Sequence, residues 1–258
     1  MGAAGGFGRY VVCSSITQKT SMRVAAFYDE QWGSKQQQQD ADTILLMMNS
    51  AVRHSYFYLG DVKGKKLLEV GCGSGQQAVY FASLGAIVTG IDVSSKSIAT
   101  QSPVGNLSVL RMDAESMRFP DESFDLIYIN ALLMHVDKEK VISECRRVLR
   151  KGGKIIVVEP LLHNPFMRIY RHFSDYKKTN PSYMTLRKFK ELSEGFSSFE
   201  HREFYFSSLV SLPLFRMLSD KQKAIAVSRI FESVDAGLLK VMPFLRGIYW
   251  VSVVKLEK

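Results

Sequence analysis

Two acidic residues and three glycines lie close together in one stretch of the chain, from Glu69 to Asp92. Gly71, Gly73 and Gly75 stand at alternate positions, where glycine lets the backbone turn sharply and lets a ligand approach the main chain. Asp92 follows the first glycine by about 20 residues, the distance at which a carboxylate reaches the hydroxyls of a ribose. The residue types and their spacing therefore predict a nucleoside-binding site.

The residues around these groups predict the elements that position them. Residues 66–70 are mostly apolar and indicate a buried parallel strand that runs straight into the glycines. Residues 76–84 carry apolar side chains at helical spacing, and Gly85 ends that helix. Residues 86–91 indicate a second buried strand with Asp92 at its carboxyl end. Together they form a strand, loop, helix, strand unit.

The glycine spacing discriminates between nucleosides. A loop that binds a pyrophosphate has the pattern G-x-G-x-x-G, and Gln76 occupies the position of the last glycine here. A dinucleotide is therefore disfavoured, and a ligand with a ribose but no phosphate fits better. The alternative is a tight turn in some other doubly wound domain.

The sequence E-V-G-C-G-S-G at 69–75 resembles the first motif of the class I S-adenosylmethionine-dependent methyltransferases. The chain is similar in particular to the enzymes that methylate ubiquinone, menaquinone and phosphoethanolamine. The resemblance implies S-adenosylmethionine as cofactor, with its methionyl ammonium near Glu69 and both ribose hydroxyls on Asp92. The cofactor-binding residues that it implies are Tyr28, Glu69, Gly71, Gly73, Gly75, Gln77, Asp92, Val93, Met112, Asp113, Ala114, Asn130 and His135.

The third predicted strand, 107–112, is followed at once by Asp113 and Ala114. The resemblance implies that Asp113 hydrogen-bonds the adenine amino group and that Ala114 packs beside the ring. Asp is also a good cap for a helix or a turn. That second interpretation of Asp113 remains open.

His135 and Tyr28 are the candidate catalytic residues. His135 follows the fourth predicted strand, 126–129, near the edge where open α/β sheets bind ligands. Imidazole titrates near neutral pH and accepts a proton from a hydroxyl or ammonium nucleophile. The resemblance to the phosphoethanolamine enzymes pairs it with Tyr28, whose ring would face the sulfonium. Two alternatives stay open: His135 only shapes the pocket, and Tyr28 only holds the N-terminal arm against the domain.

The residues after that strand, Asn130-Ala131-Leu132-Leu133, depart from the pattern of enzymes that methylate exocyclic amines of nucleic-acid bases. Those enzymes have Asn or Asp, then Pro-Pro and an aromatic residue. We therefore expect methyl transfer to an O, N or C nucleophile of a small molecule. The alternatives are an RNA or protein methyltransferase, and a cofactor-binding protein with a non-methylating activity.

The resemblance implies an α/β fold, a doubly wound, Rossmann-like sheet of seven strands in the order 3-2-1-4-5-7-6 with strand 7 antiparallel. Residues 1–23 are predicted to be a flexible arm and 24–258 a single domain. Within that domain, 24–60 form lid helices, and 161–247 include a cap over the substrate. The remaining predicted elements are helices at 40–59, 95–100, 137–149 and 181–194, and strands at 154–159, 196–206 and 248–256, with Gly152 and Gly153 ending the third of these helices.

The net charge of +9 is spread unevenly. Residues 161–258 hold 16 Lys and Arg against 9 Asp and Glu, which leaves +7 for that part and +2 for 1–160. The excess is compatible with nucleic acid, an anionic membrane face or an acidic small molecule. We expect a small-molecule acceptor, consider nucleic acid unfavoured, and keep open a peripheral membrane contact through the basic, apolar residues 207–247.

Three cysteines at wide spacing predict neither disulfides nor a zinc site, and the histidines have no mutual spacing that predicts a metal. The hydrophobic content of 46% is ordinary for a globular core and argues against disorder. We expect a cytoplasmic protein. The first 28 residues contain no acid, so organelle targeting stays open. The oligomeric state and the identity of the acceptor are not predicted.

Overall fold

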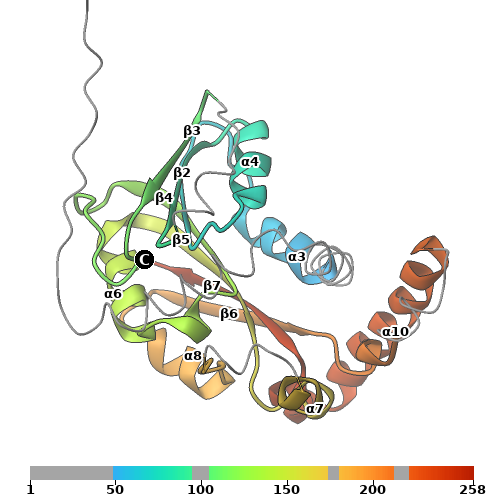
Figure 1. Ribbon diagram of the computed structural model, residues 1–258. Helices are drawn as coiled ribbons and strands as arrows, with labels where there is room; N and C mark the ends of the chain where they lie inside the picture. The colour runs from blue at the N-terminus through green and yellow to red at the C-terminus, as the bar shows by residue number, and fades with distance from the viewer. Residues whose placement is uncertain (1–48, 95–104, 174–179, 212–220) are drawn as a thin grey trace, which may run out of the picture.

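The computed structural model describes residues 49–94, 105–173, 180–211 and 221–258, and Figure 1 draws the others as a grey trace. The described strands form one seven-stranded sheet in the order β3-β2-β1-β4-β5-β7-β6. The strands are β1 (Lys66–Val70), β2 (Ile87–Asp92), β3 (Leu107–Arg111), β4 (Phe124–Asn130), β5 (Leu149–Pro160), β6 (Ser198–Phe204) and β7 (Val251–Glu257).

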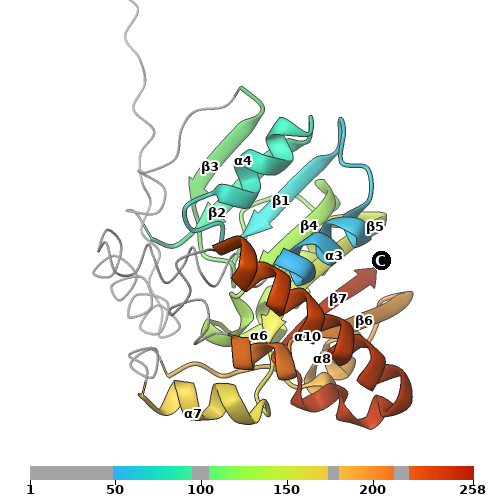
Figure 2. The ribbon, with the colours of Figure 1, turned by 90° about the vertical axis from the view of Figure 1, so that its right-hand side faces the viewer.

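The strand directions confirm the predicted topology. β1 to β5 pair in parallel, and β7 is antiparallel to both of its neighbours, β5 and β6. The central strands are buried on both faces, which explains why they read in the sequence as continuous apolar runs. Because β1 to β4 run the same way, their carboxyl ends meet at one edge of the sheet (Figure 2).

Helices cover both faces of the sheet, and each face has its own apolar core. The helices are α3 (Asn49–Leu59), α4 (Gln76–Ser83), α6 (Lys138–Val148), α7 (Pro165–Phe173), α8 (Leu186–Leu192) and α10 (Lys221–Val241), with short 3-10 helices η1 (Leu133–His135), η3 (Ser207–Ser211) and η4 (Pro243–Ile248). Residues of α3, α4 and α7 pack in one core. Residues of α6 and α8 pack in the other.

The predicted end of the third helix is wrong. The helix α6 stops at Val148, and Gly152 and Gly153 lie inside β5, which begins at Leu149. Gly152 N–H donates to the carbonyl of Lys258 (2.8 Å), and Lys258 N–H donates to the carbonyl of Gly153 (3.0 Å). The two glycines therefore belong to the strand and pair with Lys258. Gly153 in addition has no room for a side chain, because a Cβ there would lie 2.8 Å from the carbonyl oxygen of Asp125.

Other predicted bounds differ by a few residues. The predicted helix 181–194 is the shorter α8, whose first turn Thr185 caps by accepting a hydrogen bond from Lys188 N–H (3.0 Å). The predicted strands 196–206 and 248–256 are the shorter β6 and the shifted β7. The predicted arm 1–23, most of the lid region 24–60 and the predicted helix 95–100 lie outside the described residues.

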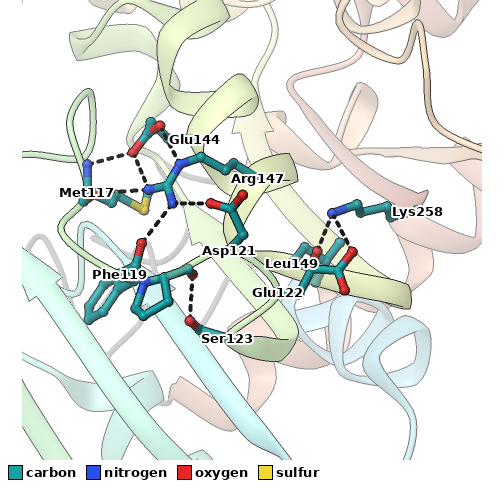
Figure 3. A network of polar contacts seen from close by, with 10 residues as sticks. Met117, Phe119, Asp121, Glu122, Ser123, Glu144, Arg147, Leu149 and Lys258 are labelled. Atoms are coloured by element: carbon teal, nitrogen blue, oxygen red, sulfur yellow. Dashed lines mark hydrogen bonds and ion pairs between the residues drawn. The ribbon is translucent and has the colours of Figure 1, made fainter.

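A polar network around Arg147, in the last turn of α6, holds the loop 117–121 that leads to β4. Figure 3 shows Arg147 between Glu144 and Asp121, donating also to the carbonyls of Met117 and Phe119 (2.9 and 2.7 Å). Because one guanidinium binds groups from both ends of 117–121, it fixes the course of that loop.

The segment 207–247 contains a long helix, as predicted. Asp235 of α10 is buried and accepts hydrogen bonds from the backbone N–H of Phe206 and Ser207 (2.8 Å each), which ties α10 to η3. Ser50 of α3 binds Glu232 of α10, and Figure 2 shows the two helices side by side. The role of this segment as a substrate cap stays a prediction.

Candidate functional site

The glycine loop between β1 and α4 has left-handed backbone at three positions. Gly71, Gly73 and Gly75 have φ values of 72°, 49° and 72°. A Cβ on Gly71 would lie 2.9 Å from the side chain of Leu132, whereas a Cβ on Gly73 would meet nothing within 4 Å. Gly71 is thus required for close packing, whereas the left-handed backbone of Gly73 is the reason for glycine at that position.

Asp92 lies at the end of β2, directly beside this loop. Its Oδ2 accepts a hydrogen bond from Gly73 N–H (2.9 Å), and its Oδ1 accepts one from Ser94 N–H (2.8 Å). These bonds fix the carboxylate next to the loop. A carboxylate has about four acceptor positions, so hydroxyl donors of a sugar can bind it as well.

Glu69 is the buried acid of the site, with 3% of its surface exposed. The backbone N–H of Ala78 hydrogen-bonds it, and its Oε2 has no hydrogen-bond partner among the residues described. Burial, with a smaller contribution from the charge of Asp92, raises the pKa of Glu69 to about 8. A buried carboxylate oxygen without a partner is costly unless a donor arrives, and an ammonium group would supply both donor and charge. The residues therefore fit the methionyl ammonium of S-adenosylmethionine.

The residues predicted for the adenine follow β3. Met112 N–H donates to the carbonyl of Asp92 (3.0 Å), which brings Asp113 next to the sugar-binding candidate. Met112 and Ala114 are buried. Asp113 Oδ1 accepts a hydrogen bond from Glu115 N–H (2.9 Å), so Asp113 does cap a turn. The capping interpretation is thus observed, while a bond to adenine stays a prediction.

A turn after β4 forms the other side of the site. Ala131 has a φ of 53°, an uncommon conformation for a residue with a Cβ. Leu132 N–H and Leu133 N–H both donate to Glu159 Oε1 (2.6 Å each). Glu159 is fully buried at the end of β5, and burial raises its pKa to about 8 against the opposing effect of these hydrogen bonds. Glu159 therefore holds this turn in place.

His135 is the last residue of η1 and is 6% exposed. Burial, and secondarily the charge of Lys138, lowers the pKa of His135 to about 4. Lys138 is itself buried, and its pKa is lowered by burial and raised by Glu159. His135 is therefore neutral at pH 7, the form that can accept a proton.

The predicted site residues that the structure describes gather at the carboxyl ends of β1 to β4. The contact between Gly71 and Leu132 links the glycine loop to the turn that carries Asn130 and His135. Asn130 Oδ1 is buried and has no hydrogen-bond partner in the described part of the chain. Gln77 and Val93 are partly exposed beside the loop. Tyr28 lies outside the described residues.

Glu159 and Lys138 are residues beside the site that the motifs do not predict. Glu159 accepts its hydrogen bonds from the turn after β4, which lies 26 and 27 residues earlier in the chain. An acid at the end of a buried strand is the signal that points to such a residue. Across the residues that the structure describes, no group of three or more His, Cys, Asp or Glu is arranged to hold a metal.

Comparisons with known proteins show which proteins the chain is similar to. Residues 68–157 match the protein family described as "Methyltransferase domain". The ubiquinone biosynthesis O-methyltransferase of Coxiella burnetii is 34% identical over 125 residues, 46% of this chain and 49% of that protein. The phosphatidylethanolamine N-methyltransferase of Cereibacter sphaeroides is 37% identical over 108 residues, 38% of this chain and 52% of that protein. The chain spans about half the length of the curated relatives it matches.

Solved structures share the fold. A SAM-dependent methyltransferase from Archaeoglobus fulgidus has a TM-score of 0.59 at 18% identity, covering 90% of this chain and 98% of that one. Phosphoethanolamine N-methyltransferase 2 of Haemonchus contortus, solved with S-adenosylhomocysteine, has a TM-score of 0.60 at 17% identity, covering 81% and 52%. The [4+2]-cyclase SpnF has a TM-score of 0.55 at 21% identity, covering 81% of each chain. The match over 68–157 and these likenesses confirm the predicted resemblance and fold, and they support the predicted cofactor.

Proposed function

We propose that this chain binds S-adenosylmethionine at the carboxyl ends of β1 to β4 and transfers its methyl group to a small-molecule acceptor. One observation carries the proposal: among the described residues Glu69 has a buried oxygen without a hydrogen-bond partner, in the strand that leads into the left-handed glycine loop, on which the carboxylate of Asp92 lies. That arrangement suits a ligand with both a positive charge and a ribose. The methyltransferase domain matched at 68–157 supports it.

Each part of the cofactor has a candidate partner. Glu69 would bind the ammonium and Asp92 the ribose hydroxyls, while the glycine loop lies along the ligand and Asp113 with its neighbours faces the adenine. When bound, S-adenosylmethionine supplies an electrophilic methyl group on a sulfonium. Displacement at a methyl group needs little covalent help, so the main task of the protein is to align the acceptor and exclude water.

His135 has the second task. Its imidazole is neutral, and it lies on the turn that Glu159 fixes, so it can take a proton from an acceptor that arrives as a hydroxyl or an ammonium. Tyr28 would place its ring against the sulfonium, which an aromatic quadrupole attracts. Whether the nucleophile is O, N or C follows from the acceptor alone.

The fold by itself does not decide the reaction, because a protein titled a [4+2]-cyclase shares it. The deciding experiment incubates the chain with S-adenosylmethionine carrying a labelled methyl group and a metabolite extract. We expect a small molecule to gain the label and the mass of one CH2. The Asp92→Ala variant, which should bind the cofactor poorly, is the control. Cofactor binding without any labelled product would contradict methyl transfer, and labelled RNA or protein would contradict the small-molecule acceptor.

A further inference from the structure

The helix α7 exposes a stripe of large apolar side chains. Phe166, Ile169 and Tyr170 are 44%, 64% and 44% exposed, whereas Met167 on the other side is buried at 8%. The three exposed residues have the spacing i, i+3, i+4 and so lie on one face of the helix. A soluble helix normally turns such a stripe toward the core. In α7 the stripe faces outward although the helix is already packed on its other side.

The end of α10 and the start of η4 expose a second apolar group at the same end of the molecule. Val241, Met242 and Phe244 are 78%, 41% and 79% exposed. Asn164, just before α7, donates to the carbonyl of Ile248 in η4 (2.9 Å), so the two segments are in contact. Figures 1 and 2 both show α7 and the red end of α10 at the bottom of the molecule. We name the six exposed residues of these two segments the basal surface.

The charge around the basal surface has one sign. The segments 162–173 and 237–249 contain no Asp or Glu, but they contain Arg168, Arg171, Lys240 and Arg246. The guanidinium of Arg171 lies 3.5 Å from the ring centroid of Tyr183 and donates to backbone carbonyls, so its role is internal.

Two acids pack nearby, Glu203 and Asp235, and both are buried. Glu203 Oε2 lies 3.8 Å from Arg246 Nε, and Asp235 accepts a hydrogen bond from the backbone N–H of Ser207 in η3. Neither carboxylate lies at the surface, so these two acids do not neutralise the positive charges of the exposed Arg168 and Lys240.

We infer that the basal surface docks on an anionic phospholipid bilayer, with its aromatic and aliphatic side chains in the interface and its cations on the headgroups. Large apolar patches rimmed by Lys and Arg have this chemistry. The contact is peripheral: no helix in the described ranges is long and apolar enough to cross a membrane.

Vesicle co-sedimentation tests the apolar part. We expect the chain to bind vesicles of phosphatidylcholine and phosphatidylglycerol and to bind pure phosphatidylcholine much more weakly. Replacing Ile169→Ser and Phe244→Ser together should weaken binding at least about tenfold, because each side chain loses its burial in the interface. Phe57→Ser is the matched control, since Phe57 is 76% exposed and belongs to α3, which Figures 1 and 2 show apart from α7.

A second pair of variants tests the charge. Arg168→Gln and Lys240→Gln should each weaken binding to the anionic vesicles about fivefold, and raised salt should do the same. Arg187→Gln on α8 is the control, because this arginine is 91% exposed and lies outside the basal surface. Circular dichroism confirms that each variant is folded.

Three results would overturn the inference. The first is wild-type binding that is absent or indifferent to anionic lipid. The second is an equal loss in Phe57→Ser and in the Ile169→Ser, Phe244→Ser variant. The third is an effect of the latter variant on RNA binding, or on a dimer seen by light scattering, with vesicle binding unchanged. Vesicle binding needs neither cofactor nor acceptor, so its failure is separate from failure of the proposed methyl transfer.

Discussion

Glu69 combines full burial with an oxygen that lacks a hydrogen-bond partner among the described residues, and this makes it the most informative single residue of the site. With a cofactor ammonium bound, the carboxylate gains a charged donor worth about 1.5–3 kcal/mol. We therefore expect Glu69→Gln to weaken S-adenosylmethionine binding about tenfold to a hundredfold in calorimetry. Thermal unfolding without ligand at pH 8 should show the variant at least as stable as the wild type, because burial disfavours the charged form that Glu69 begins to adopt at that pH. Unchanged affinity would remove Glu69 from the site.

His135 makes a prediction about the pH dependence of turnover. Burial lowers its pKa to about 4, so the imidazole stays neutral between pH 7 and pH 5.5. We expect no loss of turnover from its protonation in that range, once an acceptor has been identified by labelling. His135→Gln should lower turnover about a hundredfold and leave cofactor affinity nearly unchanged.

A pH–rate profile of both proteins checks this. An acid limb centred near the ordinary histidine pKa, present in the wild type and absent in His135→Gln, would contradict the buried neutral imidazole. Equal turnover of the two proteins would leave His135 with the pocket-shaping role alone.

At the scale of elements, the turn after β4 depends on a carboxylate from a different strand. Glu159 accepts two backbone hydrogen bonds from Leu132 and Leu133 in a buried setting. Glu159→Ala would leave two buried N–H groups unpaired, so we expect the free energy of unfolding to fall by about 2–4 kcal/mol. Glu159→Gln keeps a carbonyl acceptor and should lose less than half of that.

Urea denaturation of the three proteins measures the difference. If Glu159→Ala unfolds at the wild-type urea concentration, the two hydrogen bonds do not hold the turn. Cofactor binding by Glu159→Gln should stay within about threefold of the wild type, because Glu159 contacts the turn and not the glycine loop.

The elements that the sequence predicted well are those whose signal is local. The apolar run at 67–70, the glycine loop and Asp92 are contiguous, and the structure brings them together as expected. The end of α6 was mispredicted because Gly152 and Gly153 resemble a helix stop, whereas pairing with Lys258, far along the chain, makes them part of β5. The hydrogen bonds of Glu159 span 26 and 27 residues, so only the fold could reveal them.

At the scale of the whole molecule, two raised carboxyl pKa values link stability to pH. Burial raises the pKa of Glu69 and Glu159 from 4.5 to about 8 in the folded chain, so between these values the folded state binds more protons than the unfolded one. The contribution of both groups is therefore fully present below pH 4.5 and is lost as pH rises toward 8. The lowered pKa of His135 makes the opposite contribution to stability. Between pH 6.5 and about pH 4 the unfolded state binds more protons at this residue, so the contribution of His135 is lost as the pH falls through that range.

We expect the ligand-free protein to lose stability between pH 6.5 and pH 8 by an amount that Glu69→Gln and Glu159→Gln each reduce. Urea unfolding at both pH values measures it. A wild-type protein equally stable at the two values, or variants with the full wild-type dependence, would show that these carboxyl groups do not titrate as their burial requires.

We propose that a sulfonium nucleoside lies over the tips of β1 and β2 with its ribose on Asp92. Calorimetric titration of S-adenosylmethionine into the wild type, Asp92→Ala and the surface control Arg187→Ala tests this position of the ligand. We expect one cofactor per chain for the wild type and the control, and binding about a hundredfold weaker or absent for Asp92→Ala, because hydrogen bonds to a charged carboxylate are lost. Equal affinity of Asp92→Ala and the wild type would contradict it.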